Sequence, residues 1–108
     1  MDCCIIFEGD GNISKDSLRL RGICSDSNDA INLILKHHKF KPEDLISIGE
    51  LDDLTEDEIE EALHNVIENH LMFDGTIKSE KANLSYIITC FEYSCDFDRW
   101  IEDTTEYI

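Results

Sequence analysis

Acidic side chains crowd one short segment of this sequence and are its main source of chemistry. Between Glu50 and Glu61, eight of the twelve residues are acidic. Carboxylates at such density can bind a divalent cation, exchange protons as acid and base, or present a row of negative charge to a basic surface. A second group runs from Glu92 to Glu106, with six acids and a single basic residue, Arg99.

The negative charge of the chain is concentrated in its second half. Residues 41–108 hold 19 acidic and four basic residues, whereas residues 1–40 hold six acids and five bases. The formal net charge of −16 therefore lies almost wholly beyond residue 40. Because like charges repel, this field disfavours nucleic acids and anionic membranes and favours a basic protein surface as partner.

The run Gly9-Asp10-Gly11-Asn12-Ile13-Ser14 resembles the middle of an EF-hand calcium loop. With Ile13 at the eighth position, the loop would begin at Ile6 and end at Ser17. The motif needs Asp at its first position and a bidentate Glu at its twelfth, and both are missing here. We therefore predict a hairpin turn and no calcium site.

The histidines give weaker indications. Glu60, His64 and Glu68 recur every four residues and would line one exposed stripe of a helix. A solvated face with favourable Glu–His pairs is far commoner than a metal site in such a pattern. His70 falls on the apolar stripe of the same helix and is expected in the core.

The cysteines are odd in number and include no CxxC pair. They are Cys3, Cys4, Cys24, Cys90 and Cys95. Without paired spacing, a tetrahedral zinc site is not preorganised. We expect all five thiols to be reduced and to serve as small apolar groups.

Catalytic signatures are absent from the sequence, which has no Walker loop, no dinucleotide fingerprint and no HExxH. We therefore predict a non-catalytic protein without a cofactor or a bound metal. No apolar run approaches the roughly 18 residues that span a bilayer, and no basic leader precedes the first apolar run. The expected location is the cytoplasm, or the host cytoplasm if the chain is viral.

The N-terminal region predicts a β-hairpin. Residues 3–8 are rich in β-formers, and residues 17–23 alternate between apolar and polar side chains. Arg19 and Arg21 would face outward or toward acidic neighbours. Glu8, like the Asp10 that follows it, is expected to be exposed.

The middle of the chain predicts helices. Residues 28–38 carry apolar side chains at helical spacing, and a short helix is expected to begin at Pro42 and end at Gly49. Thr55 and Glu58 fit a capping box. The helix 55–71 that follows has one apolar stripe, formed by Ile59, Ala62, Leu63, Val66, Ile67, His70 and Leu71.

The last third of the chain adds a strand over residues 84–93, apolar on both faces, and a final helix capped by Asp96. Trp100 and Ile101 would share one side of that helix. The order of elements predicts a single α+β domain over residues 1–108. We expect an antiparallel sheet of three to four strands, with three to four helices packed mainly on one face.

The leading functional hypothesis is a small acidic inhibitor that imitates a nucleic acid and occupies the basic groove of a nucleic-acid-binding protein. Phage-encoded anti-defence inhibitors and the immunity partners of nuclease toxins share this physical profile. The residues predicted to bind the partner are Asp52, Asp53, Glu56, Asp57, Glu60, Glu61, Asp98, Glu102 and Asp103. Trp100 or Tyr107 could anchor the contact if exposed, although Trp100 is expected in the core.

Two alternatives from other classes stay open. The same carboxylates could make a divalent-metal-binding regulatory protein. A small enzyme could also assemble its site in space from residues that carry no sequence signature.

Overall fold

The computed structural model of this chain describes residues 3–92 and 99–101. In these residues one antiparallel sheet has the strand order β3-β4-β1-β2-β5. The strands are β1 (Cys3–Gly9), β2 (Arg19–Cys24), β3 (Thr76–Ser79), β4 (Leu84–Phe91) and β5 (Arg99–Trp100). The helices are α1 (Ser27–His37), α2 (Pro42–Leu45), α3 (Ile48–Leu51) and α4 (Glu56–Asp74), with a 3-10 turn, η1, at Lys15–Ser17.

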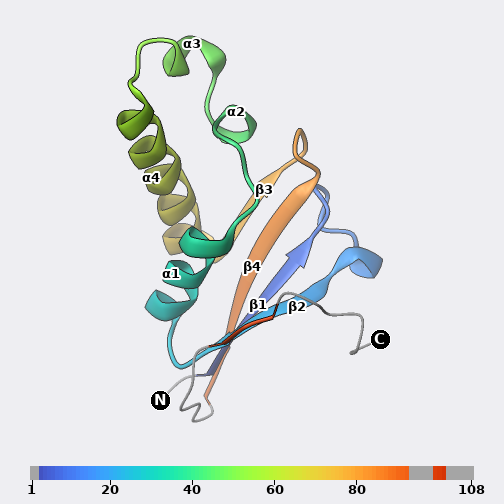
Figure 1. Cartoon of the computed structure of the whole chain (residues 1–108). Coiled ribbons are helices and arrows are strands. Elements are labelled where there is room, and N and C mark those ends of the chain that lie inside the picture. Colours follow the sequence, from blue (N-terminus) through green and yellow to red (C-terminus); the bar gives the residue numbers. More distant parts are fainter. Residues whose placement is uncertain (1–2, 93–98, 102–108) are drawn as a thin grey trace.

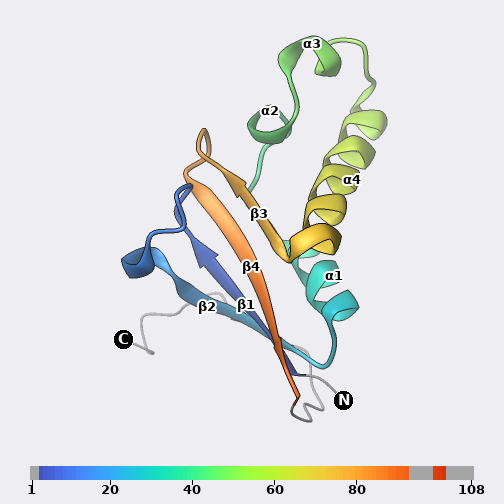
Figure 2. The ribbon, with the colours of Figure 1, turned by 180° about the vertical axis from the view of Figure 1, so that it is seen from behind.

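The helices α1 and α4 lie together on one side of the sheet (Figures 1 and 2). Between these two layers lies the core, whose fully buried members include Ile6, Ile34, Ile67 and Tyr86. The predicted α+β architecture is confirmed, with five strands where three to four were expected. In the described part, no helix is both long and apolar enough to cross a lipid bilayer.

The central strand is β1, which pairs with β2 on one side and with β4 on the other. Side chains alternate between the two faces of a strand. Cys4 and Ile6 therefore point into the core, while Ile5 and Phe7 lie on the opposite face with intermediate exposure. The register of β2 shifts between Ile6 and Phe7, which marks a β-bulge in the hairpin.

The loop of the predicted hairpin is a turn held by one carboxylate. Asp10 Oδ1 accepts the N–H groups of Asn12 (3.1 Å) and Ser14 (2.8 Å). Its bonds with Ser14, foremost the backbone N–H, lower the pKa of Asp10. At the adjacent Gly11, a Cβ would lie 2.7 Å from the Ser79 carbonyl oxygen, so only glycine fits there.

The expected helix from Pro42 to Gly49 is two separate helices, α2 and α3. Ile46 has an extended backbone and is buried, which ends α2. Ser47 then accepts the Glu50 N–H and caps α3, which therefore includes Gly49. Ser47 thus begins a second helix, and this helix runs through Gly49, where the first helix was predicted to end.

Helix α4 begins with the predicted capping box. Thr55 Oγ1 accepts the Glu58 N–H, and the Thr55 N–H donates to the Glu58 carboxylate at 3.1 Å. The helix ends at Asp74, because Gly75 adopts a left-handed φ of 73°. Its buried line is Leu63, Ile67 and Leu71. The expectation for His70 was wrong: this line is narrow, and His70 lies beside it, exposed.

The expected final helix through Trp100 is also wrong. Trp100 pairs with Gly22, and Arg99 with Ile23, so these residues form β5 against the free edge of β2. An edge strand leaves backbone groups unpaired, and this pairing satisfies part of that edge. Asp96, the expected cap, lies outside the described residues.

The structure joins Cys4 to Cys90 in a disulfide, so the expectation of five reduced thiols was wrong. These residues are directly opposite each other on β1 and β4, with Cα atoms 4.0 Å apart. The pair is separated by 86 residues in sequence and carries no spacing signature. Only the register of the two strands brings the sulfur atoms together.

The packing of α4 predicts a large cost for removing Ile67. Ile67→Ala should lower the free energy of unfolding by about 2–4 kcal/mol, because the side chain is fully buried and its loss leaves a cavity. Met72→Ala on the same helix should change it by less than about 0.5 kcal/mol, since Met72 is 66% exposed. Urea unfolding measures both. Equal effects would contradict the packing of α4 on the sheet.

The disulfide predicts a specific cross-linked peptide. An unreduced digest analysed by mass spectrometry should join the peptide containing Cys4 to the one containing Cys90. Cys4→Ser should abolish this link and Cys3→Ser should retain it, because neighbouring residues on a strand point to opposite faces. Reduction should lower the free energy of unfolding by about 2–4 kcal/mol. A native digest without the link would refute the pairing.

Candidate functional site

Eleven of the 25 acidic residues lie on a projecting segment that we call the acidic arm, residues 42–68. It comprises α2, α3 and the N-terminal turns of α4. In Figure 1, α3 and the start of α4 extend beyond the end of the sheet, and the molecule measures 44 × 28 × 22 Å. From residue 42 to residue 77 the sequence contains no Lys or Arg. The arm therefore carries negative charge that its own residues do not balance.

The structure brings part of the predicted partner-binding set together. All six of the described members are exposed: Asp52, Asp53, Glu56, Asp57, Glu60 and Glu61. Asp57, Glu60 and Glu61 border one shallow hollow of about 470 Å³ on α4. Asp98, Glu102, Asp103 and Tyr107 lie outside the described residues.

The acids of the arm are not neutralised by ion pairs within the described part of the chain. The ion pairs there join Glu8 to Arg21 and to Lys39. At the start of α4, hydrogen bonds from the Thr55 backbone N–H and then its hydroxyl lower the pKa of Glu58. Within the described part of the chain, the arm is therefore an acidic surface without compensating ion pairs.

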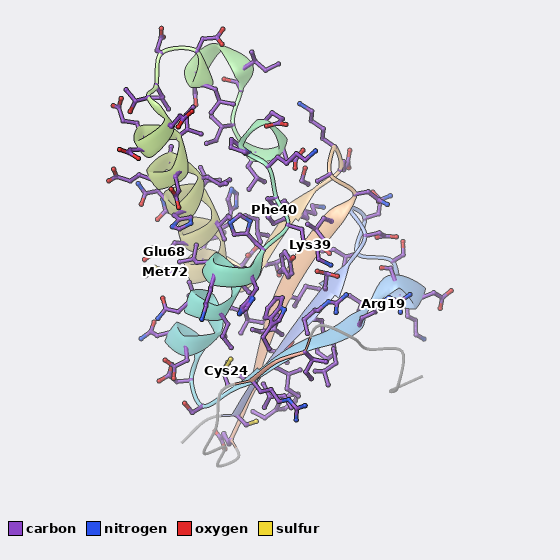
Figure 3. All side chains as sticks on the ribbon, in the orientation of Figure 1. Arg19, Cys24, Lys39, Phe40, Glu68 and Met72 are labelled. Carbon is purple, nitrogen blue, oxygen red and sulfur yellow. A yellow bond between two sulfur atoms is a disulfide. The ribbon has the colours of Figure 1, made fainter. Side chains whose placement is uncertain are left out.

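The metal-binding alternative gains no support from the geometry. His64 turns inward and meets His38 edge to face, with ring centroids 6.1 Å apart. Glu60 and Glu68 are exposed, and Figure 3 shows Glu68 on the side of α4 away from the sheet. Within residues 3–92 and 99–101, no group of three or more Asp, Glu, His or Cys residues is placed to hold a metal ion.

Sequence reasoning missed a buried ionic cluster on the helix-covered face of the sheet. Arg21 Nε donates to Glu8 Oε2 at 3.0 Å, and Lys39 Nζ lies 3.7 Å from the same oxygen. Arg21 Nη1 also donates to the Ile101 carbonyl at 3.1 Å. The expectation that Glu8 is exposed was wrong, because the residue is only 8% exposed.

The bulge in β2 explains why Arg21 reaches Glu8. Arg21 and Gly22 together oppose Ile6, so the extra residue re-aims the arginine toward the helices. The sequence does contain one signal, a glutamate across a predicted hairpin from alternating arginines. A bulge changes the face to which the following side chains point, so this signal could not show whether Arg19 or Arg21 pairs with Glu8.

Aromatic rings surround the cluster. Tyr86 is fully buried and its hydroxyl accepts the Lys39 backbone N–H at 3.2 Å. Burial, and then the Glu8 carboxylate, raise the pKa of Tyr86 well above its ordinary value, so the phenol stays neutral. Trp100 is partly buried and stacks on His37, with centroids 4.9 Å apart. Trp100 thus packs against the core, as expected, and is not an exposed aromatic anchor for a partner.

Comparison of the chain with protein-family models, with curated proteins and with solved structures found no match in any of the three. The functional argument therefore rests on the residues and their arrangement.

The contact between α1 and α4 predicts a pH dependence of stability. Burial, and then the nearby His64 imidazole, lower the pKa of His38 from its ordinary value of 6.5. The unfolded chain therefore binds this proton more readily than the folded protein. The contribution of His38 is complete above about pH 6.5 and is lost as the pH falls through the lowered pKa.

Urea unfolding at pH 7.5 and pH 5.0 tests this dependence. The free energy of unfolding should fall less between pH 7.5 and pH 5.0 in His38→Gln than in the wild type, because glutamine cannot be protonated. His70→Gln removes an exposed histidine from α4 and should keep the wild-type difference. Identical pH differences in wild type and His38→Gln would contradict the assignment.

Proposed function

We propose that this protein is a small, non-catalytic binding protein whose acidic arm occupies a basic groove on a nucleic-acid-binding protein. The observation that carries the proposal is the uncompensated arm, exposed, rigid and without a single Lys or Arg from residue 42 to residue 77. Inhibition would follow, because the arm and the nucleic acid would compete for the same groove. Anti-defence proteins and toxin-immunity proteins are the classes that this mode of action fits.

The rigidity of the arm supports binding by charge display. Helix α4 packs on the core through Leu63, Ile67 and Leu71, so the backbone that carries its exposed acidic residues is held in place. Binding therefore requires little ordering of the helix that carries the charge, which keeps the entropic cost of association low. A basic groove that neutralises phosphates can also attract carboxylates, because both groups carry negative charge.

A charged surface kept only for solubility would look different in one respect. On the outer face of α4, Glu–Lys pairs would give solubility and also a few tenths of a kcal/mol of helix stability each, about 0.2–0.5 kcal/mol per pair. This helix has no Lys or Arg at all. The repulsion among its carboxylates is a cost that binding to a cationic surface would relieve.

Affinity capture from a cognate lysate at low salt, followed by mass spectrometry, identifies the partner. The partner should bind DNA or RNA in the absence of this protein and lose that binding in its presence. Association should slow steeply with added salt, because steering acts over a screening length of about 8–10 Å.

Charge reversal distinguishes the effect of the arm on association from the effect of the net charge of the molecule. Lys at Asp53, Glu60 and Glu61 together should slow association by about tenfold or more. These positions avoid the first turn of α4, where lysines would oppose the helix dipole. The matched control reverses Asp16, Glu80 and Glu92, which are exposed and lie off the arm.

Stopped-flow or surface-based kinetics measures both variants after urea unfolding has confirmed their folds. Equal slowing in the two variants would reduce the effect to net charge and sink the proposal. Association of the arm variant at the wild-type rate would do the same.

A further inference from the structure

Four of the nine Lys and Arg residues of this acidic protein line two neighbouring hollows. Two hollows on the helix-covered side of the sheet share Lys39 in their walls. The first, about 270 Å³, is lined by Arg21, His37, Lys39 and Trp100. The second, about 340 Å³, is lined by Lys39, Lys41, Asp44, Lys81 and residues 82–84. We call the two hollows together the Lys39 groove.

The Lys39 groove has an excess of positive charge. Four of the nine Lys and Arg residues of the chain line it: Arg21, Lys39, Lys41 and Lys81. The carboxylates beside them are Asp44, which accepts the Lys41 backbone N–H, and Glu8, which bonds Arg21. A concave site lined by one sign of charge concentrates the field and attracts the opposite charge.

Lys39 is placed to serve both hollows. Its Nζ lies 3.7 Å from Glu8 Oε2, beyond hydrogen-bond distance, and its side chain is 61% exposed. Figure 3 shows Lys39 over the sheet, at the point where the chain leaves α1. The Lys39 backbone is fixed, because its N–H donates to the buried Tyr86 hydroxyl at 3.2 Å. The Lys39 side chain thus extends from a held backbone position, and its ammonium group can donate hydrogen bonds to a ligand.

We propose that the Lys39 groove binds a small molecule with two oxyanion groups, one in each hollow, with Lys39 between them. Phosphate and carboxylate groups share the required chemistry, since both accept charge-assisted hydrogen bonds from Lys and Arg. The size of the hollows fits a compact ligand. A nucleic-acid strand is disfavoured, because it would extend past Asp44 and Glu43 onto the acidic arm.

The Lys39 groove meets the acidic arm only at Asp44, and Trp100 makes binding in the groove measurable. Trp100 is the single tryptophan of the chain and lines the first hollow. Its fluorescence therefore reports on the first hollow. Inorganic pyrophosphate and citrate serve as probes for phosphate and carboxylate, titrated at an ionic strength held constant with sodium chloride. Amide NMR shifts of Lys39, Lys41 and Asn83 provide a second readout for the other hollow.

A saturable change with pyrophosphate, citrate or both supports the site, and the probe that binds more tightly identifies the preferred group. Lys39→Gln should weaken binding by about tenfold or more, because it removes a charge-assisted contact shared by both hollows. Lys81→Gln should weaken it less. Lys36→Gln is the matched control, since Lys36 is exposed on α1 and lies outside the groove.

Three outcomes would overturn the proposal. The first is the absence of a saturable change in both readouts with both probes. The second is equal weakening by Lys39→Gln and Lys36→Gln, which would mean unspecific screening of charge. The third is shifts confined to residues away from the groove. Urea unfolding of Lys39→Gln checks that its fold is retained, and Arg21 is left intact because it bonds the buried Glu8.

Discussion

The pairing of β1 on both of its edges is the constraint on which the rest of the structure depends. All seven residues of β1 are in register with β4, which comes some eighty residues later in the chain. This register sets Cys4 opposite Cys90 and Glu8 opposite Tyr86. On its other edge, β1 pairs with β2, whose bulge turns Arg21 toward Glu8. A slip of one residue would move every one of these side chains to the opposite face.

The buried Glu8–Arg21 pair gives that register chemical specificity. Removing charges from water costs several kcal/mol per ion, so such a pair is tolerated only when its geometry is good. Here the pair is charge-assisted at 3.0 Å, Arg21 also reaches the Ile101 carbonyl, and Lys39 approaches from the surface. Any register that separated the two residues would bury an unpaired charge. The pair thus links β1, β2 and the residue that follows β5.

The molecule separates its charges in space. The acidic arm projects beyond the sheet (Figure 1), while Lys39, which lines both hollows of the groove, lies over the sheet where α1 ends (Figure 3). The two regions adjoin: Lys41 lines the groove, the arm begins at the next residue, and Asp44 of the arm also lines the groove. A basic protein surface would therefore contact the acidic arm, and a small anion would contact the Lys39 groove. Binding at one would alter the local field at the other within a screening length of about 8–10 Å.

The sequence by itself determined the elements whose signals are local. The capping box at Thr55 and Glu58 and the hairpin turn at Asp10 each depend on residues within a few positions, and both are present. The exposure of the acids from Asp52 to Glu61 was equally predictable, because dense carboxylates cannot be buried. Only the tertiary structure decided the long-range features. The disulfide, the edge strand β5 and the burial of Glu8 depend on strand register and on a bulge, and the gathering of Lys39, Lys41 and Lys81 depends on two loops that meet only in the folded chain. Register is fixed by the packing of the whole sheet, and no short window of sequence contains it.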